Sequence, residues 1–301
     1  MLADRDKASP PGSRRSHRRR ALATLGVVAL ALAAYAFLVE PTWVEVRETL
    51  VAVRGLPASF EGFTVLHLSD LHLDSRPGAQ NLEQAIAVAA SIQPDLIAIT
   101  GDFVSGFRGA GFEIIARLDA LDAPHGVVAV LGNHDMAAGS GRIEAELGVA
   151  GVRVLRNERL TISRGDEQIS IVGLDDPGFG EGNWEAFGRA AAKEIAALDA
   201  LLAEVPDGEA RLLLVHNPDM LELARGRDLG LALCGHTHGG QVYVPWIGAV
   251  WVPSYFGLRF ARSPVDVDGL PVVISRGLGT ITLPVRFLAR PEVGVVRLTA
   301  L

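Results

Sequence analysis

Short apolar runs recur along the chain after residue 40, and each is followed by a glycine or a polar cluster. Short runs that are apolar throughout are typical of strands buried on both faces of a sheet. They lie at 63–68, 96–100, 126–131, 211–215 and 231–234, with further strands expected at 43–47, 50–53, 271–275, 293–298 and, as two or three short strands, over 152–173. Helical segments are expected at 81–92, 112–121, 141–148 and 184–202. This alternation predicts one α/β domain over 44–301.

Polar side chains follow five of these predicted strands, at the point where each strand ends. They are Asp70 with His72, Asp102, Asn133 with His134, His216, and His236 with His238. In open α/β sheets, ligands bind beyond the carboxyl ends of the strands. We therefore expect the clusters to meet on one edge of the domain. His67 lies within its strand, where alternation turns it away from Asp70, and we interpret it as a structural histidine.

The donor types in these clusters indicate a metal centre. Carboxylates, an amide and several imidazoles suit Mn, Fe, Zn or Ni, whereas Mg prefers oxygen ligands alone. The set nearly suffices for two divalent ions if Asp102 bridges them. Two ions about 3.5–4 Å apart form a clamp for in-line displacement at phosphorus. When each residue is considered alone, the alternative role of Asp102 is a helix cap, and the alternative role of Asn133 is a turn residue.

The clusters in their order resemble the calcineurin-like metallophosphoesterase superfamily over about residues 60–240. The matching motifs are Asp70-Leu71-His72, Gly101-Asp102, Gly132-Asn133-His134-Asp135, His216 and Gly235-His236-Thr237-His238. The resemblance implies an α/β fold of four layers, in which two mixed β-sheets are flanked by helices. It also implies hydrolysis of a phosphate ester or pyrophosphate by in-line attack of a metal-bound hydroxide.

The same resemblance implies a role for each residue of the site. The first ion would be held by Asp70, His72 and His238, the second by Asn133, His216 and His236, and both by Asp102. His134 would face the substrate, stabilise the transition state and protonate the leaving oxygen. Asp135 would orient a neighbouring imidazole. Protein phosphatases of the superfamily carry Asp and Arg where Ser105 and Gly106 stand here, which weakens a phosphoprotein substrate.

The C-terminal part resembles a bacterial membrane-associated branch of the superfamily. Its motifs are Gly235 to Val242, Ser275-Arg276-Gly277-Leu278-Gly279 and Leu283-Pro284-Val285-Arg286-Phe287. The branch implies a lipid-linked substrate such as UDP-2,3-diacylglucosamine or a phospholipid. Arg276 or Arg286 would bind a second phosphate, with a surface arginine as the alternative. An apolar insertion is expected to line an acyl-chain groove, or else to be core or to touch the bilayer: Trp246, Ile247, Val250, Trp251, Val252, Tyr255 and Phe256.

An uncharged apolar run from Ala21 to Val39 has the length of a membrane span. Seven Lys and Arg residues precede it, and only Arg47 and Arg54 follow closely. The positive-inside rule predicts a cytoplasmic basic tail over 1–20, an anchor or uncleaved signal over 21–39, and a catalytic domain on the outer side. The alternatives are a signal cleaved near Ala34-Tyr35-Ala36 and a domain on the cytoplasmic face, where UDP-2,3-diacylglucosamine is the better substrate.

Composition narrows the classes of partner. The net charge of -7, with no basic cluster beyond the N-terminus, disfavours a general nucleic-acid binder. Cys234 is the sole cysteine, so no internal disulfide is available. The expected partners are the membrane and a phosphorylated, lipid-linked small molecule, and no protein partner is inferred. The alternative function is a catalytically silent envelope binding or scaffold protein that keeps its metals for stability.

Overall fold

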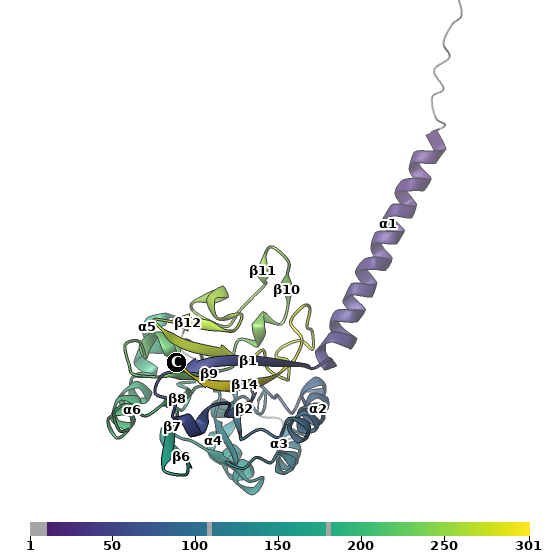
Figure 1. Ribbon diagram of the computed structural model, residues 1–301. Coiled ribbons are helices and arrows are strands. Elements are labelled where there is room, and N and C mark those ends of the chain that lie inside the picture. Colours follow the sequence, from purple (N-terminus) through teal and green to yellow (C-terminus); the bar gives the residue numbers. More distant parts are fainter. Residues whose placement is uncertain (1–10, 107–109, 179–181) are drawn as a thin grey trace, which may run out of the picture.

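The computed structural model describes residues 11–106, 110–178 and 182–301. The first ten residues of the expected basic tail lie outside this part. Within it, two six-stranded mixed sheets pack face to face, and helices cover their outer faces (Figure 1). This is the α/β sandwich that the sequence predicts.

The first sheet is parallel except where its second and third strands meet. Its order is β1 (Glu45–Val53), β14 (Glu292–Ala300), β2 (Thr64–Leu68), β3 (Leu96–Thr100), β4 (Val127–Val130) and β5 (Val152–Val154). The central strands β2, β3 and β4 are buried on both faces, as their uninterrupted apolar runs predict. Because they run parallel, their carboxyl ends lie at one edge.

The second sheet is also mixed, with antiparallel strands at both edges. Its order is β12 (Val265–Val267), β13 (Leu270–Ile274), β9 (Leu231–Cys234), β8 (Arg211–Leu214), β7 (Glu167–Gly173) and β6 (Glu158–Arg164). The strands β13, β9, β8 and β7 are parallel to one another. Their carboxyl ends therefore also share an edge, and the polar clusters after β8 and β9 come from this sheet.

The core has three apolar layers, which explains the order helix, sheet, sheet, helix. Between the sheets, Val65 and Val130 belong to the same buried cluster as Leu214 and Leu233. The outer face of the first sheet packs on α2 (Arg76–Ile92), α3 (Ala110–Ile115) and α4 (Asn133–Val149). The outer face of the second packs on α5 (Trp184–Ala190), α6 (Ala192–Ala203) and the short α7 (Met220–Leu223).

The helix expected at 141–148 begins earlier than its sequence suggests. The helix α4 starts at Asn133, where the Gly132 N–H donates to Asp135 at 3.0 Å and so caps the first turn. Gly139 interrupts it with a φ of 109°, so helical propensity along the sequence does not reveal the first half of α4. Two further features were not expected: the strand β12 and a small hairpin of β10 (Tyr243–Val244) and β11 (Gly248–Ala249).

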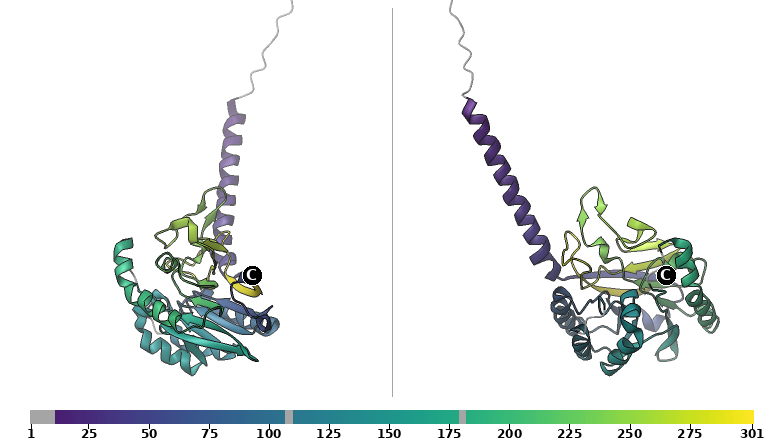
Figure 2. Two further views of the ribbon diagram at one scale, coloured as in Figure 1. Left: turned by 60° about the vertical axis from the view of Figure 1, so that its left-hand side comes forward. Right: turned by 180° about the vertical axis from the view of Figure 1, so that it is seen from behind.

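The N-terminal helix α1 (Pro11–Ala34) extends away from the sandwich (Figures 1 and 2). Residues Ser16–Thr42 form a helical segment that is long and apolar enough to cross a membrane, and it is almost entirely exposed. Its last turns, Tyr35–Val39 and Glu40–Thr42, are docked on the domain. The Ala36 carbonyl accepts from the Arg286 N–H at 3.0 Å, and the buried Glu40 accepts from the Ala289 N–H at 2.7 Å.

His67 lies fully buried on β2, with its Nε2 atom 2.9 Å from the Thr100 hydroxyl. Burial lowers the pKa of His67 to about 3. The His67 ring therefore stays neutral in the folded protein at pH values below about 6.5, at which the unfolded chain binds a proton on it. Stability is complete above that pH and falls as the pH drops from about 6.5 toward 3.

We expect His67→Gln to weaken this dependence on pH, because glutamine does not titrate. The native chain should lose about 2 kcal/mol more stability than the variant between pH 7.5 and pH 5. Chemical unfolding of both proteins in detergent, followed by tryptophan fluorescence, measures this difference. Parallel loss of stability in the two proteins would show that His67 does not carry it.

Candidate metal centre

The structure brings the polar ends of the strands together at one edge of the sandwich. The loops after β2, β3 and β4 come from the first sheet, and those after β8 and β9 come from the second. They deliver two groups of potential ligands: Asp70, His72 and His238, and Asp102, His216 and His236. Within each group the ligand atoms lie within 4.8 Å of one another. Each group draws on both sheets, so the pairing of the sheets creates the site.

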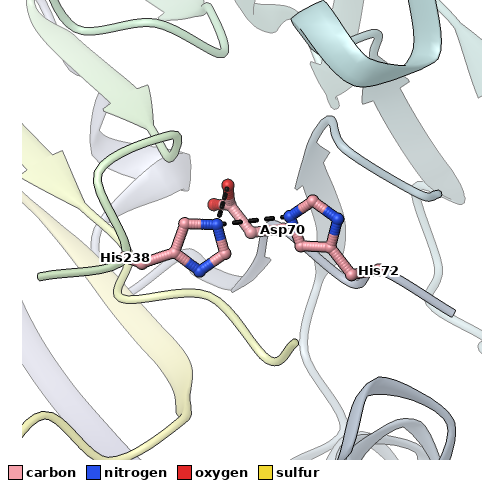
Figure 3. Close-up of side chains that lie close together, drawn as sticks. All are labelled: Asp70, His72 and His238. Carbon is pink, nitrogen blue, oxygen red and sulfur yellow. Dashed lines mark hydrogen bonds and ion pairs between the residues drawn. The ribbon is translucent and has the colours of Figure 1, made fainter. Parts of the chain in front are cut away.

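The first group is buried, and its side chains point toward one another (Figure 3). The His238 Nε2 atom lies 3.2 Å from an Asp70 carboxylate oxygen and 3.2 Å from the His72 Nε2 atom. Two ring nitrogens that face each other at this distance repel unless a cation lies between them or one carries a proton. The arrangement fits a divalent ion.

The second group repeats this pattern. The His216 Nε2 atom lies 3.1 Å from Asp102 Oδ2 and 3.2 Å from His236 Nδ1. The amide oxygen of Asn133 lies 3.1 Å from the same His216 nitrogen. Asp102 Oδ2 is also 3.8 Å from His72 Nε2, so this carboxylate stands between the two groups. The donor set of nitrogen and oxygen atoms suits borderline divalent metals.

The pKa values of the histidine ligands are shifted in opposite directions. Burial lowers the pKa of His72 to about 4 and that of His236 to about 3, so both rings are neutral at pH 7, as ligands must be. Burial also lowers the pKa of His216, but the Asp102 carboxylate outweighs it and raises this pKa well above its usual range. An ion bound there would therefore displace a proton from His216.

The backbone of the centre is strained at the ligands themselves. Five ligand residues adopt positive φ: Asp70 (48°), His72 (43°), Asp102 (57°), His236 (69°) and His238 (51°). A non-glycine residue in this region costs on the order of 1 kcal/mol or more, and the conformation persists only where surrounding contacts impose it. This backbone strain occurs in the turns that follow the strands, where it orients each ligand side chain.

Two glycines admit the ligands at close range. A Cβ atom at Gly132 would collide with the Asp102 carboxylate, and one at Gly235 would collide with Ser69 and Asp70. Neither glycine has a positive φ. Space, rather than backbone freedom, therefore demands glycine at both positions.

His134 lines the same cavity as the two ligand groups. This cavity measures about 410 Å³, and its lining includes Asp102, Asn133, His236 and His238. The His134 N–H donates to Asp102 Oδ1 at 3.0 Å, and its ring Nδ1 lies 2.8 Å from the Ser105 carbonyl oxygen. A carbonyl oxygen can only accept in this contact, so Nδ1 carries a proton.

Asp135 has a different partner from the imidazole that the resemblance implies. Its carboxylate accepts from the backbone N–H groups of Asp102 at 2.8 Å, Phe103 at 2.9 Å and Gly132 at 3.0 Å. The expected contact with an imidazole is therefore wrong. Asp135 instead ties the loop after β3 to the start of α4, and so sets the position of the Asp102 side chain.

Ser105 is a site residue that the sequence showed only as a departure from the protein phosphatases. Its hydroxyl lies 2.9 Å from His72 Nδ1, its carbonyl oxygen accepts from His134, and its N–H donates to Asp74 at 2.8 Å. It thereby orients both a ligand and the histidine beside the cavity. The one available signal was its place three residues after Asp102.

The two arginines expected to bind a second phosphate are engaged elsewhere. Arg286 is fully buried, and its guanidinium donates to four carbonyl oxygens, those of Arg276, Gly277, Gly279 and Ala289. Arg276 pairs with Glu45 at 2.7 Å and Glu292 at 2.6 Å. The structure contradicts a phosphate fork at either position, because both arginines hold the loop that packs behind Asp70.

The apolar insertion divides into two parts. Trp251 and Tyr255, with Phe187, line a cavity of about 450 Å³ that shares His236 and Asn133 with the metal-side cavity. Trp246 and Ile247 instead lie on the β10–β11 hairpin, exposed to solvent. The segment after the hairpin thus extends the site with an apolar wall.

Several known proteins are similar to this chain in sequence. Residues 63–240 match the calcineurin-like phosphoesterase family. The uncharacterized metallophosphoesterase YkuE of Bacillus subtilis (strain 168) is 31% identical over 268 residues, which cover 88% of each chain. The phosphodiesterase YaeI of Escherichia coli (strain K12) is 31% identical over 289 residues, 94% of this chain and 99% of YaeI. A Danio rerio transmembrane protein with metallophosphoesterase domain is 27% identical, over 92% of this chain and 62% of that protein.

The chain therefore belongs to the calcineurin-like metallophosphoesterase family, as its motifs predict. It is a phosphoester hydrolase by family, and divalent metals are the cofactors of that family. The two groups of buried ligands could hold two such ions.

We expect Gly235→Ala to empty the first ligand group, because the added Cβ collides with Ser69 and Asp70. Elemental analysis of the purified variant should show at least one ion fewer per chain than the native protein. Gly141→Ala is the matched control, since a Cβ there meets nothing within 4 Å and its φ is not positive. A full metal content in Gly235→Ala would contradict the packing argument.

Proposed function

We propose that this protein is a membrane-anchored phosphodiesterase with two divalent ions, acting on a phosphate ester or pyrophosphate of a lipid-linked substrate. The observation that carries the proposal is the pair of ligand groups, buried except for the half-buried His236, that meet at Asp102, with His134 lining the same cavity. Mn, Fe, Zn and Ni remain the candidates for the ions, since the donors combine nitrogen and oxygen.

Each residue of the centre then has a defined role. Two divalent ions supply an activated water and neutralise charge at phosphorus. Their ligands are Asp70, His72 and His238 for one ion, Asn133, His216 and His236 for the other, and Asp102 for both. His134 stabilises charge on the phosphoryl group and gives a proton to the leaving oxygen. The carbonyl of Ser105 supports that step by holding the proton on Nδ1 of His134.

The apolar wall beside the centre favours a substrate whose phosphate carries a lipid-like group, either as the leaving group or as the group that stays on phosphorus. Trp251, Tyr255 and Phe187 face a cavity of about 450 Å³ that adjoins the ligands. Pockets that are mostly apolar with a few convergent polar groups are typical of small-molecule sites. Among the described residues, Arg276 and Arg286 are both engaged elsewhere and neither offers a fork for a second phosphate, which favours a phospholipid-type diester over a UDP-linked lipid.

Retention of the N-terminal helix is supported by its junction with the domain. Cleavage near Ala36 would remove a buried residue whose carbonyl accepts from Arg286. Four residues further on, Glu40 is fully buried and bonded to Ala289. These contacts favour a segment that is retained, and the arginines before the span favour a cytoplasmic N-terminus. The catalytic domain is then on the outer side of the membrane.

We expect His134→Ala to lower kcat about 10²–10⁴-fold on a model phosphodiester such as bis-p-nitrophenyl phosphate, because general acid catalysis is lost. The metal content should stay unchanged, since His134 is not among the ligands. His125→Ala is a control on the loop before β4, where the ring packs on Phe63. Full turnover by His134→Ala would contradict the assignment. Absence of hydrolysis by the native protein across a phosphoester panel with Mn, Fe, Zn or Ni would favour the scaffold alternative.

We expect a periplasmic reporter fused after Leu301 to be active. Alkaline phosphatase gains activity only outside the cytoplasm, whereas green fluorescent protein exported in unfolded form stays dark and fluoresces only when it remains in the cytoplasm. The two fusions therefore give opposite signals. Activity of the phosphatase fusion supports the outer orientation. Fluorescence of the second fusion, with an inactive phosphatase, would place the domain in the cytoplasm and make UDP-2,3-diacylglucosamine the better substrate.

A further inference from the structure

The β10–β11 hairpin exposes large apolar side chains beside the N-terminal helix. Trp246 is fully exposed and Ile247 is 71% exposed. In all three views the hairpin rises from the side of the domain on which α1 leaves it (Figures 1 and 2). Exposed apolar groups that cluster in this way mark a surface with a partner.

The turn of this hairpin also has a strained backbone, in addition to its exposed apolar side chains. The Ile247 N–H donates to the Val244 carbonyl at 3.1 Å, which places Pro245 second and Trp246 third in a four-residue turn. Trp246 has a φ of 67°. Proline second and a positive φ third are the pattern of a type II turn, whose third position favours glycine. Tryptophan there is both strained and exposed, and its full exposure leaves its side chain unpacked against the described residues.

The hairpin is physically continuous with the end of the N-terminal helix. The Tyr243 N–H donates to the Phe287 carbonyl at 2.8 Å, and the Phe287 ring packs edge-on against Tyr35 with centroids 6.4 Å apart. Leu283 and Leu288 on the intervening loop are exposed as well. An apolar surface therefore runs from the helix across this loop to the hairpin.

Aromatic and basic groups border this surface. The Arg290 guanidinium lies 4.2 Å from the ring centre of the half-exposed Trp43, just after the span. The Arg262 guanidinium lies 3.6 Å from the ring centre of Tyr243 at the base of the hairpin. Tryptophan, tyrosine and basic groups at one level are typical of the interface between a bilayer and water.

We propose that the tip of the β10–β11 hairpin inserts into the interfacial layer of the bilayer that holds α1. This inference rests on the membrane anchoring proposed above. Insertion gives the strained, exposed Trp246 an apolar environment. It also brings Trp251 and Tyr255, which follow the hairpin and line the apolar cavity, to the lipid surface. A lipid-linked phosphate would then reach the metal centre while its chains stay in the membrane.

Fluorescence quenching in nanodiscs tests this proposal on the full-length protein. Cys234 is fully buried, so a single cysteine introduced at Ile247→Cys can be labelled selectively with an environment-sensitive fluorophore. We expect nitroxide lipids labelled near the head of the acyl chain to quench it at least twofold more than a probe at Val149→Cys. Val149 is 85% exposed at the end of α4, and this helix lies on the opposite side of the domain from the hairpin in Figure 1.

A third probe at Leu30→Cys, on the exposed apolar face of α1, separates the two proposals. Quenching at residue 30 but not at 247 would overturn hairpin insertion and leave the anchor in place. Quenching at neither position would overturn the anchor as well. A blue-shifted probe at 247 that lipid nitroxides do not quench would show that a second protein copy covers the hairpin, which also overturns the proposal.

Trp246→Gly provides the matched variant, because glycine adopts a φ of 67° without strain. We expect it to fold at least as well as the native protein and to hydrolyse a soluble model phosphodiester at a rate within about twofold of the native rate. We also expect it to halve the lipid quenching of the probe at 247, as loss of the largest inserting side chain requires. Unchanged quenching in this variant would overturn the role assigned to Trp246.

Discussion

The Asp102 carboxylate is the constraint on which the centre depends. One oxygen lies 3.1 Å from His216 and 3.8 Å from His72, and the other accepts the His134 N–H. A carboxylate buried to this degree is costly unless positive charge and hydrogen bonds surround it. Its position is set by a second carboxylate, because Asp135 binds the Asp102 N–H and so fixes the strained turn that aims it.

The pairing of two sheets explains why the site lies where it does. Each ligand group combines residues after strands of the first sheet with residues after β8 or β9 of the second. The apolar layer between the sheets therefore fixes the separation of the ligands, and packing density leaves that layer little freedom. The strain at the ligand residues is held by contacts between neighbouring loops, as where Asp135 binds the Asp102 N–H.

The segment after His238, the loop near residues 276–289 and the end of the N-terminal helix contact one another in series. The loop near residues 276–289 is held by buried Arg286, contacts the last turns of the N-terminal helix, and carries the base of the hairpin through Phe287. Arginine serves here as a structural clamp, because its five donors can satisfy several carbonyl oxygens at once. The end of the N-terminal helix, the hairpin and the metal centre thus all contact this one loop.

Most of the strands and helices, though not β12 or the β10–β11 hairpin, and the identity of the clustered residues follow from the sequence, because burial periodicity and donor chemistry are local properties. Apolar runs ending in Asp70, Asp102 or His216 could be recognised without any knowledge of their neighbours. The tertiary structure alone decided what each charged group touches. It engaged Arg276 with two glutamates and Arg286 with four carbonyl oxygens, gave Asp135 a backbone partner, brought Ser105 to two histidines, and separated Trp246 from Trp251. Those outcomes depend on contacts between segments far apart in the chain, which a linear pattern does not contain.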